Sequence, residues 1–159
     1  MIFILSSKKL EISTECISGN CKNGFGVKLT KEEGSSDSKY EGEFKDGLFN
    51  GKGIFNFDGE YKGDFKNGLF HGKGTYNFDG LKYKGDFKDN LFHGKGVLTY
   101  ADGHKYSGDF KIGYYHGIGI ETFVNGSIYS GGFKKGEPHG EIIQTFADGA
   151  KFEGNIDSE

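Results

Sequence analysis

The chain has 159 residues, of which only 34% are apolar, whereas Gly, Phe and Tyr contribute 29, 16 and 9 residues. Few aliphatic side chains combined with many aromatic rings and glycines favour a thin sheet held by aromatic packing, and they exclude the aromatic-poor composition of a disordered chain. The formal net charge is −3 and all 20 Lys/Arg residues are Lys. This argues against a nucleic-acid-binding protein and against strong recognition of anionic lipids, because Arg is the preferred phosphate ligand.

The N-terminal segment, residues 1–16, is left unassigned. Its first five residues are apolar, but this run is too short to cross a membrane and lacks the charged, long apolar and small-residue parts of a signal peptide. Cys16 lies five residues before Cys21. On one strand this odd separation would point them to opposite faces, so we expect no disulfide between them. A metal or redox site is not expected either, because no second cysteine pair or nearby His accompanies them.

The repeated pattern is clear from Tyr40 onward, so residues 17–39 are predicted to form a degenerate first repeat followed by a polar loop. The motif Y-x-G-x-F-K recurs five times, at residues 40–45, 61–66, 83–88, 106–111 and 129–134, and residues 152–159 begin a partial sixth copy. Self-similarity at a period of roughly 20 residues is typical of proteins in which each repeat stacks only on its neighbours. Residues 40–151 are therefore interpreted as an array of five repeats.

Each repeat is predicted to be a β-hairpin. Tyr61 and Phe65 alternate with charged residues, which indicates a half-buried strand. An Asn-Gly turn at 67–68, a second alternating run and an Asp-Gly turn at 79–80 complete the repeat, and both dipeptides favour hairpins. Asn90 replaces the first-turn Gly in the third repeat, which predicts a left-handed backbone there. The predicted fold class is all-β: an elongated, single-layer antiparallel meander of stacked β-hairpins.

Four of the five histidines occupy the same position in successive repeats, namely His71, His93, His116 and His139. Equivalent residues of successive hairpins lie two strands apart, roughly 9–10 Å, which is too far for the ligands of one metal ion. Asn50 holds this position in the first repeat, so a hydrogen-bonding role that stabilises the turn is the preferred interpretation. The sequence also contains no catalytic triad pattern, phosphate-binding loop or metalloprotease motif. We therefore predict no enzyme activity, no cofactor and no metal site.

Two sets of residues are predicted to bind a partner. In a single-layer sheet part of the aromatic face stays accessible, and large accessible apolar patches mark interaction sites. This aromatic face comprises Tyr61, Phe65, Tyr76, Phe78, Tyr83, Phe87, Tyr100, Tyr106 and Phe110. The second set, the turn ridge, comprises Leu48, Leu69, Leu91 and Tyr114, one residue following each of four first turns. For both sets, packing within the molecule is the alternative interpretation.

The block Y-x-G-x-F-K-x-G-x-x-H-G-x-G, followed after an alternating run by D-G, resembles the MORN (membrane occupation and recognition nexus) repeat. The resemblance covers residues 40–156 well and 17–39 weakly. The chain differs in using Phe where the family often has Trp, and in lacking the usual Pro before D-G. The resemblance implies an elongated, twisted single sheet with one hairpin per repeat. It also implies an interaction module, because MORN arrays in other proteins bind partner proteins, organise cytoskeletal and ciliary structures, associate with membranes or accompany catalytic domains.

The repeats and the resemblance together predict a non-catalytic scaffold that binds a protein partner, which is a peptide, a helix or another subunit. A peripheral membrane module and a regulatory module of a larger enzyme are the alternatives. Open-ended sheets can join end to end, so a homo-oligomer formed through terminal strands is a further expectation. We predict no nucleic-acid partner and a cytoplasmic location, with association to the cytoskeleton or a membrane left open.

Overall fold

The computed structural model describes residues 12–32 and 35–156; the remaining residues, which include most of the unassigned N-terminal segment and the end of the partial sixth repeat, lie outside the described ranges. Within those ranges, thirteen antiparallel strands form one sheet whose spatial order is the order of the chain. The predicted meander of hairpins is therefore confirmed. The strands are β1 (Ile12–Gly19), β2 (Gly24–Glu32), β3 (Ser38–Lys45), β4 (Leu48–Asn56), β5 (Glu60–Lys66), β6 (Leu69–Phe78), β7 (Leu81–Lys88), β8 (Leu91–Thr99), β9 (Lys105–Lys111), β10 (Tyr114–Thr122), β11 (Ile128–Lys134), β12 (Glu137–Thr145) and β13 (Lys151–Ile156).

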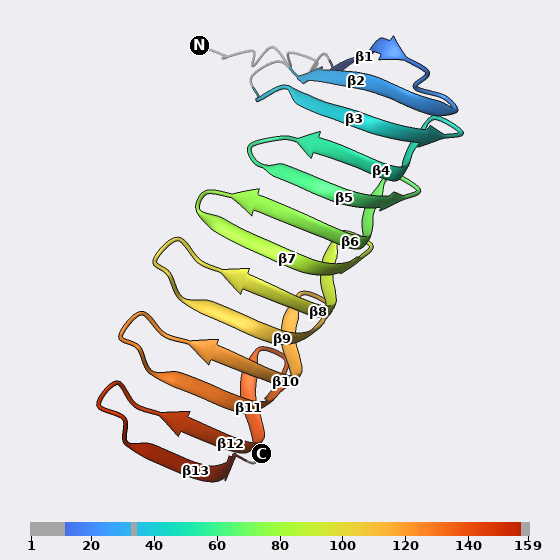
Figure 1. Ribbon diagram of the computed structural model, residues 1–159. Coiled ribbons are helices and arrows are strands. Elements are labelled where there is room, and N and C mark those ends of the chain that lie inside the picture. Colours follow the sequence, from blue (N-terminus) through green and yellow to red (C-terminus); the bar gives the residue numbers. More distant parts are fainter. Residues whose placement is uncertain (1–11, 33–34, 157–159) are drawn as a thin grey trace, which may run out of the picture.

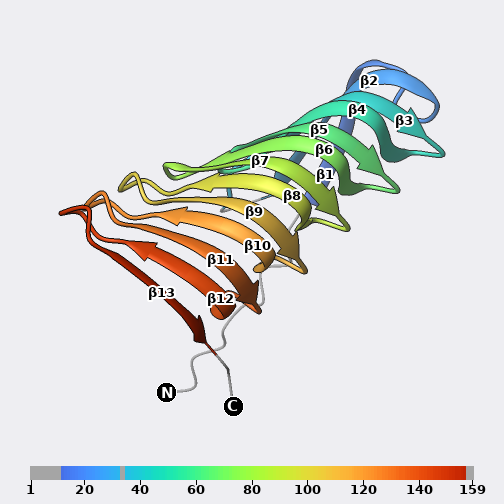
Figure 2. The ribbon, with the colours of Figure 1, turned by 60° about the horizontal axis from the view of Figure 1, so that its bottom comes forward.

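The sheet is long and narrow, because each strand pairs only with its neighbours in the sequence (Figure 1). The strands lie like rungs from the N-terminal to the C-terminal end, and successive rungs rotate gradually (Figure 2). The steric preference of L-residues for twisted strands accounts for this rotation. Each full repeat consists of a first strand that carries the Y-x-G-x-F-K motif (β3, β5, β7, β9 or β11) and a second strand that returns (β4, β6, β8, β10 or β12).

The turn between a first and a second strand is a tight two-residue turn. In β5–β6, Lys66 pairs with Leu69, and the two residues between them, Asn67 and Gly68, have φ angles of 52° and 83°. Two successive left-handed residues are typical of the type I′ turn, whose twist matches that of the flanking strands. Asn90 has a φ of 69°, which confirms the left-handed backbone predicted from its replacement of Gly.

A bulge bends the second strand. In β5–β6 the register shifts between Gly63 and Asp64, which leaves Gly72 and Lys73 of β6 without partners on β5. Gly72 has a φ of 63°, and the Asp64 carboxylate accepts a hydrogen bond from the backbone N–H of Lys73 at 3.0 Å. Bulges bend the strand that contains them. As a result, the start of the second strand runs across the rungs along one edge of the sheet (Figure 1).

The bent starts of the second strands stack on one another along this edge. The backbone N–H of Gly68 donates to the carbonyl of Phe49 in the preceding repeat at 2.8 Å. The same bond recurs from Asn90 to Phe70, Gly113 to Phe92 and Gly136 to Tyr115. These bonds pair an N–H of each first turn with a carbonyl in the bent start of the preceding second strand, and they hold each turn against the previous one.

The aromatic core lies between the sheet and these bent segments. Tyr61 is 1% exposed, and its ring stacks on that of Phe70 with 3.7 Å between the ring centroids. The Tyr61 ring also meets Phe65 of its own strand and Phe87 of the next repeat edge-on, at 5.0 and 4.9 Å. Stacked and edge-to-face arrangements are the favourable geometries for aromatic pairs. The contact with Phe87 joins one repeat to the next, so the core is continuous along the array.

Cys16 and Cys21 form a disulfide, with 5.9 Å between their Cα atoms. The prediction that they would not pair is therefore wrong. It assumed that both residues lie on one regular strand, but β1 ends at Gly19 and its register shifts between Cys16 and Ser18. Cys21 lies in the turn to β2, where alternation of side chains no longer applies, and the turn brings its sulfur back towards β1.

Candidate partner-binding faces

The sheet face opposite the aromatic core is hollowed across β2 to β8. The hollow has a volume of about 950 Å³ and is open to solvent along the array. Its central row consists of residues that pair directly across successive strands. The residues of this row are Glu41, Ile54, Lys62, Thr75, Lys84 and Val97. We call the row together with the hollow around it the outer groove.

Two lysines give the outer groove its positive charge. Lys62 and Lys84 are exposed, and neither forms an ion pair among the described residues. Thr75 lies between them in register, and its hydroxyl donates to the carbonyl of Lys62 at 3.4 Å. The two lysines are two strands apart, roughly 9–10 Å. They can therefore contact two separate acidic groups of an extended ligand.

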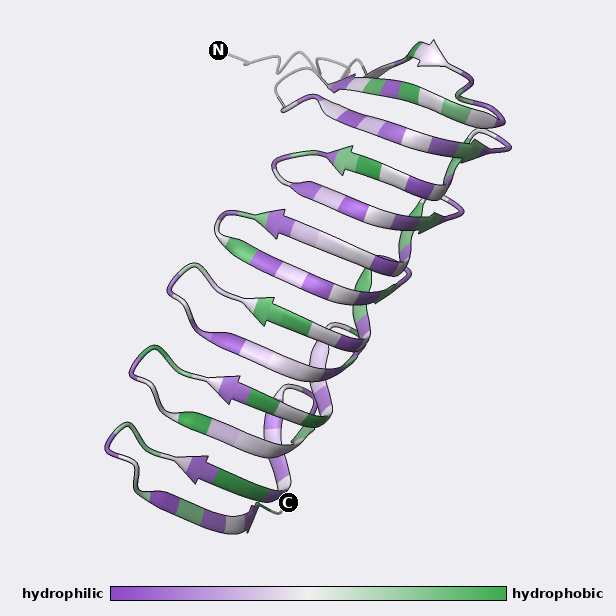
Figure 3. Cartoon of the chain, viewed as in Figure 1, coloured by the Kyte–Doolittle hydropathy of each residue, from purple (hydrophilic) through white to green (hydrophobic). Residues whose placement is uncertain are grey.

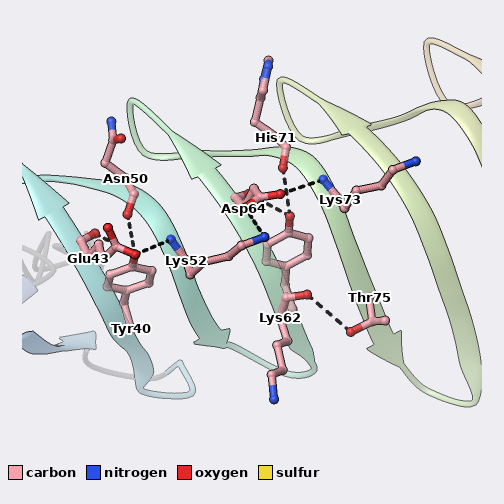
Figure 4. A network of polar contacts seen from close by, with 10 residues as sticks. Tyr40, Glu43, Asn50, Lys52, Lys62, Asp64, His71, Lys73 and Thr75 are labelled. Atoms are coloured by element: carbon pink, nitrogen blue, oxygen red, sulfur yellow. Dashed lines mark hydrogen bonds and ion pairs between the residues drawn. The ribbon is translucent and has the colours of Figure 1, made fainter. Parts of the chain in front are cut away.

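A ladder of ion pairs beside the outer groove joins successive hairpins (Figure 4). The ammonium of Lys52 binds the carboxylate of Asp64, one hairpin further on. The same contact joins Lys73 to Asp86 and Lys95 to Asp109. Burial alone would raise the pKa of the Asp64 carboxyl, but the hydrogen bonds from Lys52 and from the backbone N–H of Lys73 outweigh burial and lower its pKa. The aspartates therefore neutralise this lysine row, and the outer groove keeps its unpaired charges.

In each of the first four full repeats, from β3–β4 to β9–β10, a core tyrosine holds the hairpin together. The Tyr61 hydroxyl donates to the carbonyl of Asp64 at 2.8 Å and lies 3.4 Å from the carbonyl oxygen of His71. Its ring covers Gly74 so closely that an added Cβ there would lie 2.6 Å from ring atoms. Tyr40, Tyr83 and Tyr106 make the same contacts. Burial raises the pKa of the Tyr40 and Tyr106 hydroxyls to about 12 and also raises those of Tyr61 and Tyr83.

Most of the predicted aromatic face lies in this core. The exposed fraction is only 0–4% for six of its nine members, which are Tyr61, Phe65, Tyr83, Phe87, Tyr106 and Phe110. The prediction that these six rings line an accessible surface is wrong, because the bent starts of the second strands cover them. Tyr76 and Tyr100 are half-buried, and only Phe78 of the set is exposed.

The turn ridge is exposed to solvent along the edge of the sheet where the second strands bend. Its members are 36–58% exposed, and one follows each of four successive turns: Leu48, Leu69, Leu91 and Tyr114. The next residue in each repeat points the other way. Phe70, for example, stacks on Tyr61 in the core. The ridge is thus an accessible apolar row, and its role in binding stays a prediction.

The histidine position contributes a backbone carbonyl to the tyrosine contacts, whereas the side chain takes no part in them. Figure 4 shows the side chains of Asn50 and His71 pointing away from these contacts, while their carbonyls face the tyrosine hydroxyls. The ring of His71 instead lies 3.6 Å from the carboxylate of Asp89 in the next turn. No group of three or more His, Cys, Asp or Glu residues within the described ranges could hold a metal ion.

The outer groove was missed by the sequence analysis, which followed the aromatic positions only. A signal for it was nevertheless present. The residue after the motif tyrosine is Lys62 or Lys84 in two adjacent repeats but Ser107 and Ser130 in the next two. Reading this position down the repeats would have located a basic segment on the face opposite the rings.

The MORN repeat family matches residues 40–59, 61–80, 83–105, 106–128 and 129–151, which make up more than half of the chain. A search of curated proteins finds no match. In the part of the chain that the structure describes, no helical segment has the length and hydropathy needed to cross a membrane. The five matched segments coincide with the five hairpin repeats of the array, so the chain belongs to the MORN repeat family, whose repeats are generally interaction modules.

Proposed function

We propose that the chain is a non-catalytic scaffold that binds a protein partner along its outer groove. The observation that carries this proposal is the hollow of about 950 Å³, which spans several hairpins and contains two lysines without an ion-pair partner in the described part of the chain. A sheet stiffened by a continuous aromatic core keeps its shape on binding, so little conformational entropy is lost. The β-branched residues Ile54, Thr75 and Val97 supply apolar contact area between the charges.

The shape and charge of the outer groove favour an extended segment over a compact ligand. The central row crosses the strands, and each hairpin adds one equivalent position. In an extended polyproline II segment, which has three residues per turn and rises roughly 3.1 Å per residue, every third side chain points to the same side and lies one hairpin further along the array. A segment with acidic residues three positions apart can therefore pair with Lys62 and Lys84 at the same time.

The test is affinity capture from a cell lysate with three proteins: wild type, the double variant Lys62→Glu/Lys84→Glu, and a ridge variant Leu48→Lys/Leu69→Lys/Leu91→Lys. All substituted side chains are exposed, so circular dichroism and thermal melting should match wild type. A protein retained by wild type and by the ridge variant, and lost from the lysine variant, is the expected result. A partner retained equally by the lysine variant would contradict groove binding.

Association with a membrane is the second candidate, and the exposed turn ridge is the observation that favours it. Leu48, Leu69 and Leu91 form an apolar row at one edge of the sheet, and such a row can enter the headgroup region of a bilayer. Co-sedimentation with phosphatidylcholine vesicles that is lost in the ridge variant would support this candidate. A cytoplasmic location, a regulatory role beside an enzyme and self-association through terminal strands stay predictions.

A further inference from the structure

A second hollow lies on the same sheet face as the outer groove but over β10 to β13. Its volume is about 750 Å³. Three isoleucines line it, Ile118, Ile120 and Ile143, and their exposed fractions are 68%, 50% and 42%. We call these three residues the isoleucine patch. In Figure 3, β10 and β12 carry green, hydrophobic stretches, as do β4 and β8, whereas β6 is pale.

One residue of the isoleucine patch, Ile118, replaces a lysine of the ion-pair ladder, whereas Ile120 and Ile143 continue the central row of the outer groove. Ile118 occupies the position of Lys52, Lys73 and Lys95, and Gly132 opposite it occupies the position of their aspartate partners. The lost aspartate has a structural reason, because a Cβ at Gly132 would lie 1.9 Å from the carbonyl oxygen of His139. No comparable steric contact explains the isoleucine at position 118. Its side chain stands in solvent, where a polar residue would be favoured unless the surface is covered.

The charged residues beside the isoleucine patch are acidic, whereas lysines occupy the equivalent positions in the outer groove. Glu141 lies in the row of Lys52 and Lys73, and Glu153 lies in the row of Lys62 and Lys84. Both glutamates are exposed, line the same hollow and form no ion pair among the described residues. An apolar surface flanked by unpaired carboxylates is complementary to a segment that carries apolar side chains next to Lys or Arg.

We propose that the isoleucine patch is a second docking site, separate from the outer groove, and that it binds a basic amphipathic peptide segment of a partner protein. The unpaired Glu141 and Glu153 distinguish this occupant from two others. An anionic membrane would be repelled by them. Two copies of the chain that met through this patch would bring the same glutamates together, and like charges across an interface oppose association.

The test uses a random 12-residue peptide library displayed on phage and selected on the whole chain. The key variant, Ile118→Lys/Ile120→Thr/Ile143→Thr, carries at each position a residue found at the equivalent place of another repeat, namely Lys95 or Thr75. It is therefore expected to fold, which circular dichroism and thermal melting check. We expect wild type to enrich peptides that combine apolar residues with Lys or Arg, and their affinity to fall at least tenfold in this variant.

A charge variant and a groove variant separate the proposed site from its neighbours. Glu141→Lys/Glu153→Lys should also weaken the enriched basic peptides, whereas Lys62→Glu/Lys84→Glu should leave them unchanged. The proposal is overturned if enriched peptides are uniformly acidic or uncharged, if the isoleucine variant binds them as wild type does, or if wild type enriches none. It is equally overturned if light scattering shows a dimer of wild type that the isoleucine variant abolishes. Binding to phosphatidylcholine vesicles that depends on the three isoleucines would have the same consequence.

Discussion

Hairpins β5–β6 and β11–β12 share the same strand pairing but differ in the contacts of the core tyrosine that hold the two strands together. In β5–β6, Tyr61 lies over Gly74 and its hydroxyl binds two backbone carbonyls. In β11–β12 the residue equivalent to Gly74 is Ile142, and the buried hydroxyl of Tyr129 has no hydrogen-bond partner among the residues that the structure describes. The hairpin forms in both cases, so the tyrosine contacts are not needed for topology. They add stability and fix the bent start of the second strand against the sheet.

High pH should lower the free energy of unfolding more than any single substitution, because it ionises the buried tyrosines of four repeats at once. Burial raises the pKa of Tyr40 and Tyr106 to about 12, against roughly 10 in an unfolded chain. The stability contributed by these neutral hydroxyls is fully present below about pH 10 and is lost as the pH rises towards 12. We expect cooperative unfolding in this pH window, and far-UV circular dichroism measures it. A far-UV circular dichroism spectrum that stays native-like up to pH 12 would contradict the tyrosine account.

The Gly74→Ile substitution places the residue of the fifth repeat into the second. Its Cβ would lie 2.6 Å from the Tyr61 ring, so the ring must leave its stack. We expect a loss of about 3 kcal/mol in the free energy of unfolding, measured with urea, as for severe overpacking. The matched control is Thr75→Ile on the opposite face, where Ile54 and Val97 already occupy the equivalent positions. A loss of similar size in the control would show that strand disruption, and not the ring, is responsible.

Removal of a single tyrosine hydroxyl compares the stability of a hairpin that has the tyrosine hydrogen bonds with one that lacks them, and it changes the structure less than Gly74→Ile does. Tyr61→Phe deletes a hydrogen bond of 2.8 Å to the Asp64 carbonyl and should cost about 1 kcal/mol. Tyr129→Phe removes a buried hydroxyl that no described residue binds, so it should be neutral or slightly stabilising. Thermal melting of both variants in parallel measures the contrast. Equal losses would mean that the tyrosine hydroxyls do not stabilise the hairpins of the first four full repeats.

The smallest expected effect concerns the ion-pair ladder, which the fifth repeat lacks. Lys73→Ala removes only an exposed ion pair with Asp86 and should cost less than about 0.5 kcal/mol. Asp86→Ala also removes the acceptor of the backbone N–H of Lys95, at 3.0 Å, and should cost about 1 kcal/mol. Urea unfolding of the two variants gives the difference. If the lysine variant loses as much as the aspartate variant, the carboxylate does not cap the bulge.

The hairpins were predictable because local signals agree. Alternation around Tyr61 and Phe65, together with Asn-Gly and Asp-Gly dipeptides, specifies strands and turns over a few residues. The left-handed backbone at Asn90 followed from the Gly in the other repeats. These inferences use contacts close in sequence, which a single chain reveals well.

The bulge was not predictable in the same way, and the error about the aromatic face follows from it. The bend arises from a register shift between paired strands, and β11–β12 has the same shift although Gly132 stands in the place of Asp64. Without the bend the sheet has one layer and exposed rings. With the bend, Phe70 and its equivalents fold back over the tyrosines and close the core. Accessible surface is then left on the opposite face, where the sequence analysis had proposed no site.

The most direct test of this account places a photo-cross-linking residue, p-benzoylphenylalanine, at one of two exposed positions in the full chain: Phe25, which lines the outer groove, or Leu69 on the turn ridge. Irradiation in lysate is followed by identification of the captured proteins. We predict that a partner protein is cross-linked from position 25 and not from position 69. Cross-linking of a partner from position 69 alone would contradict the claim that the face opposite the aromatic core is the one that binds.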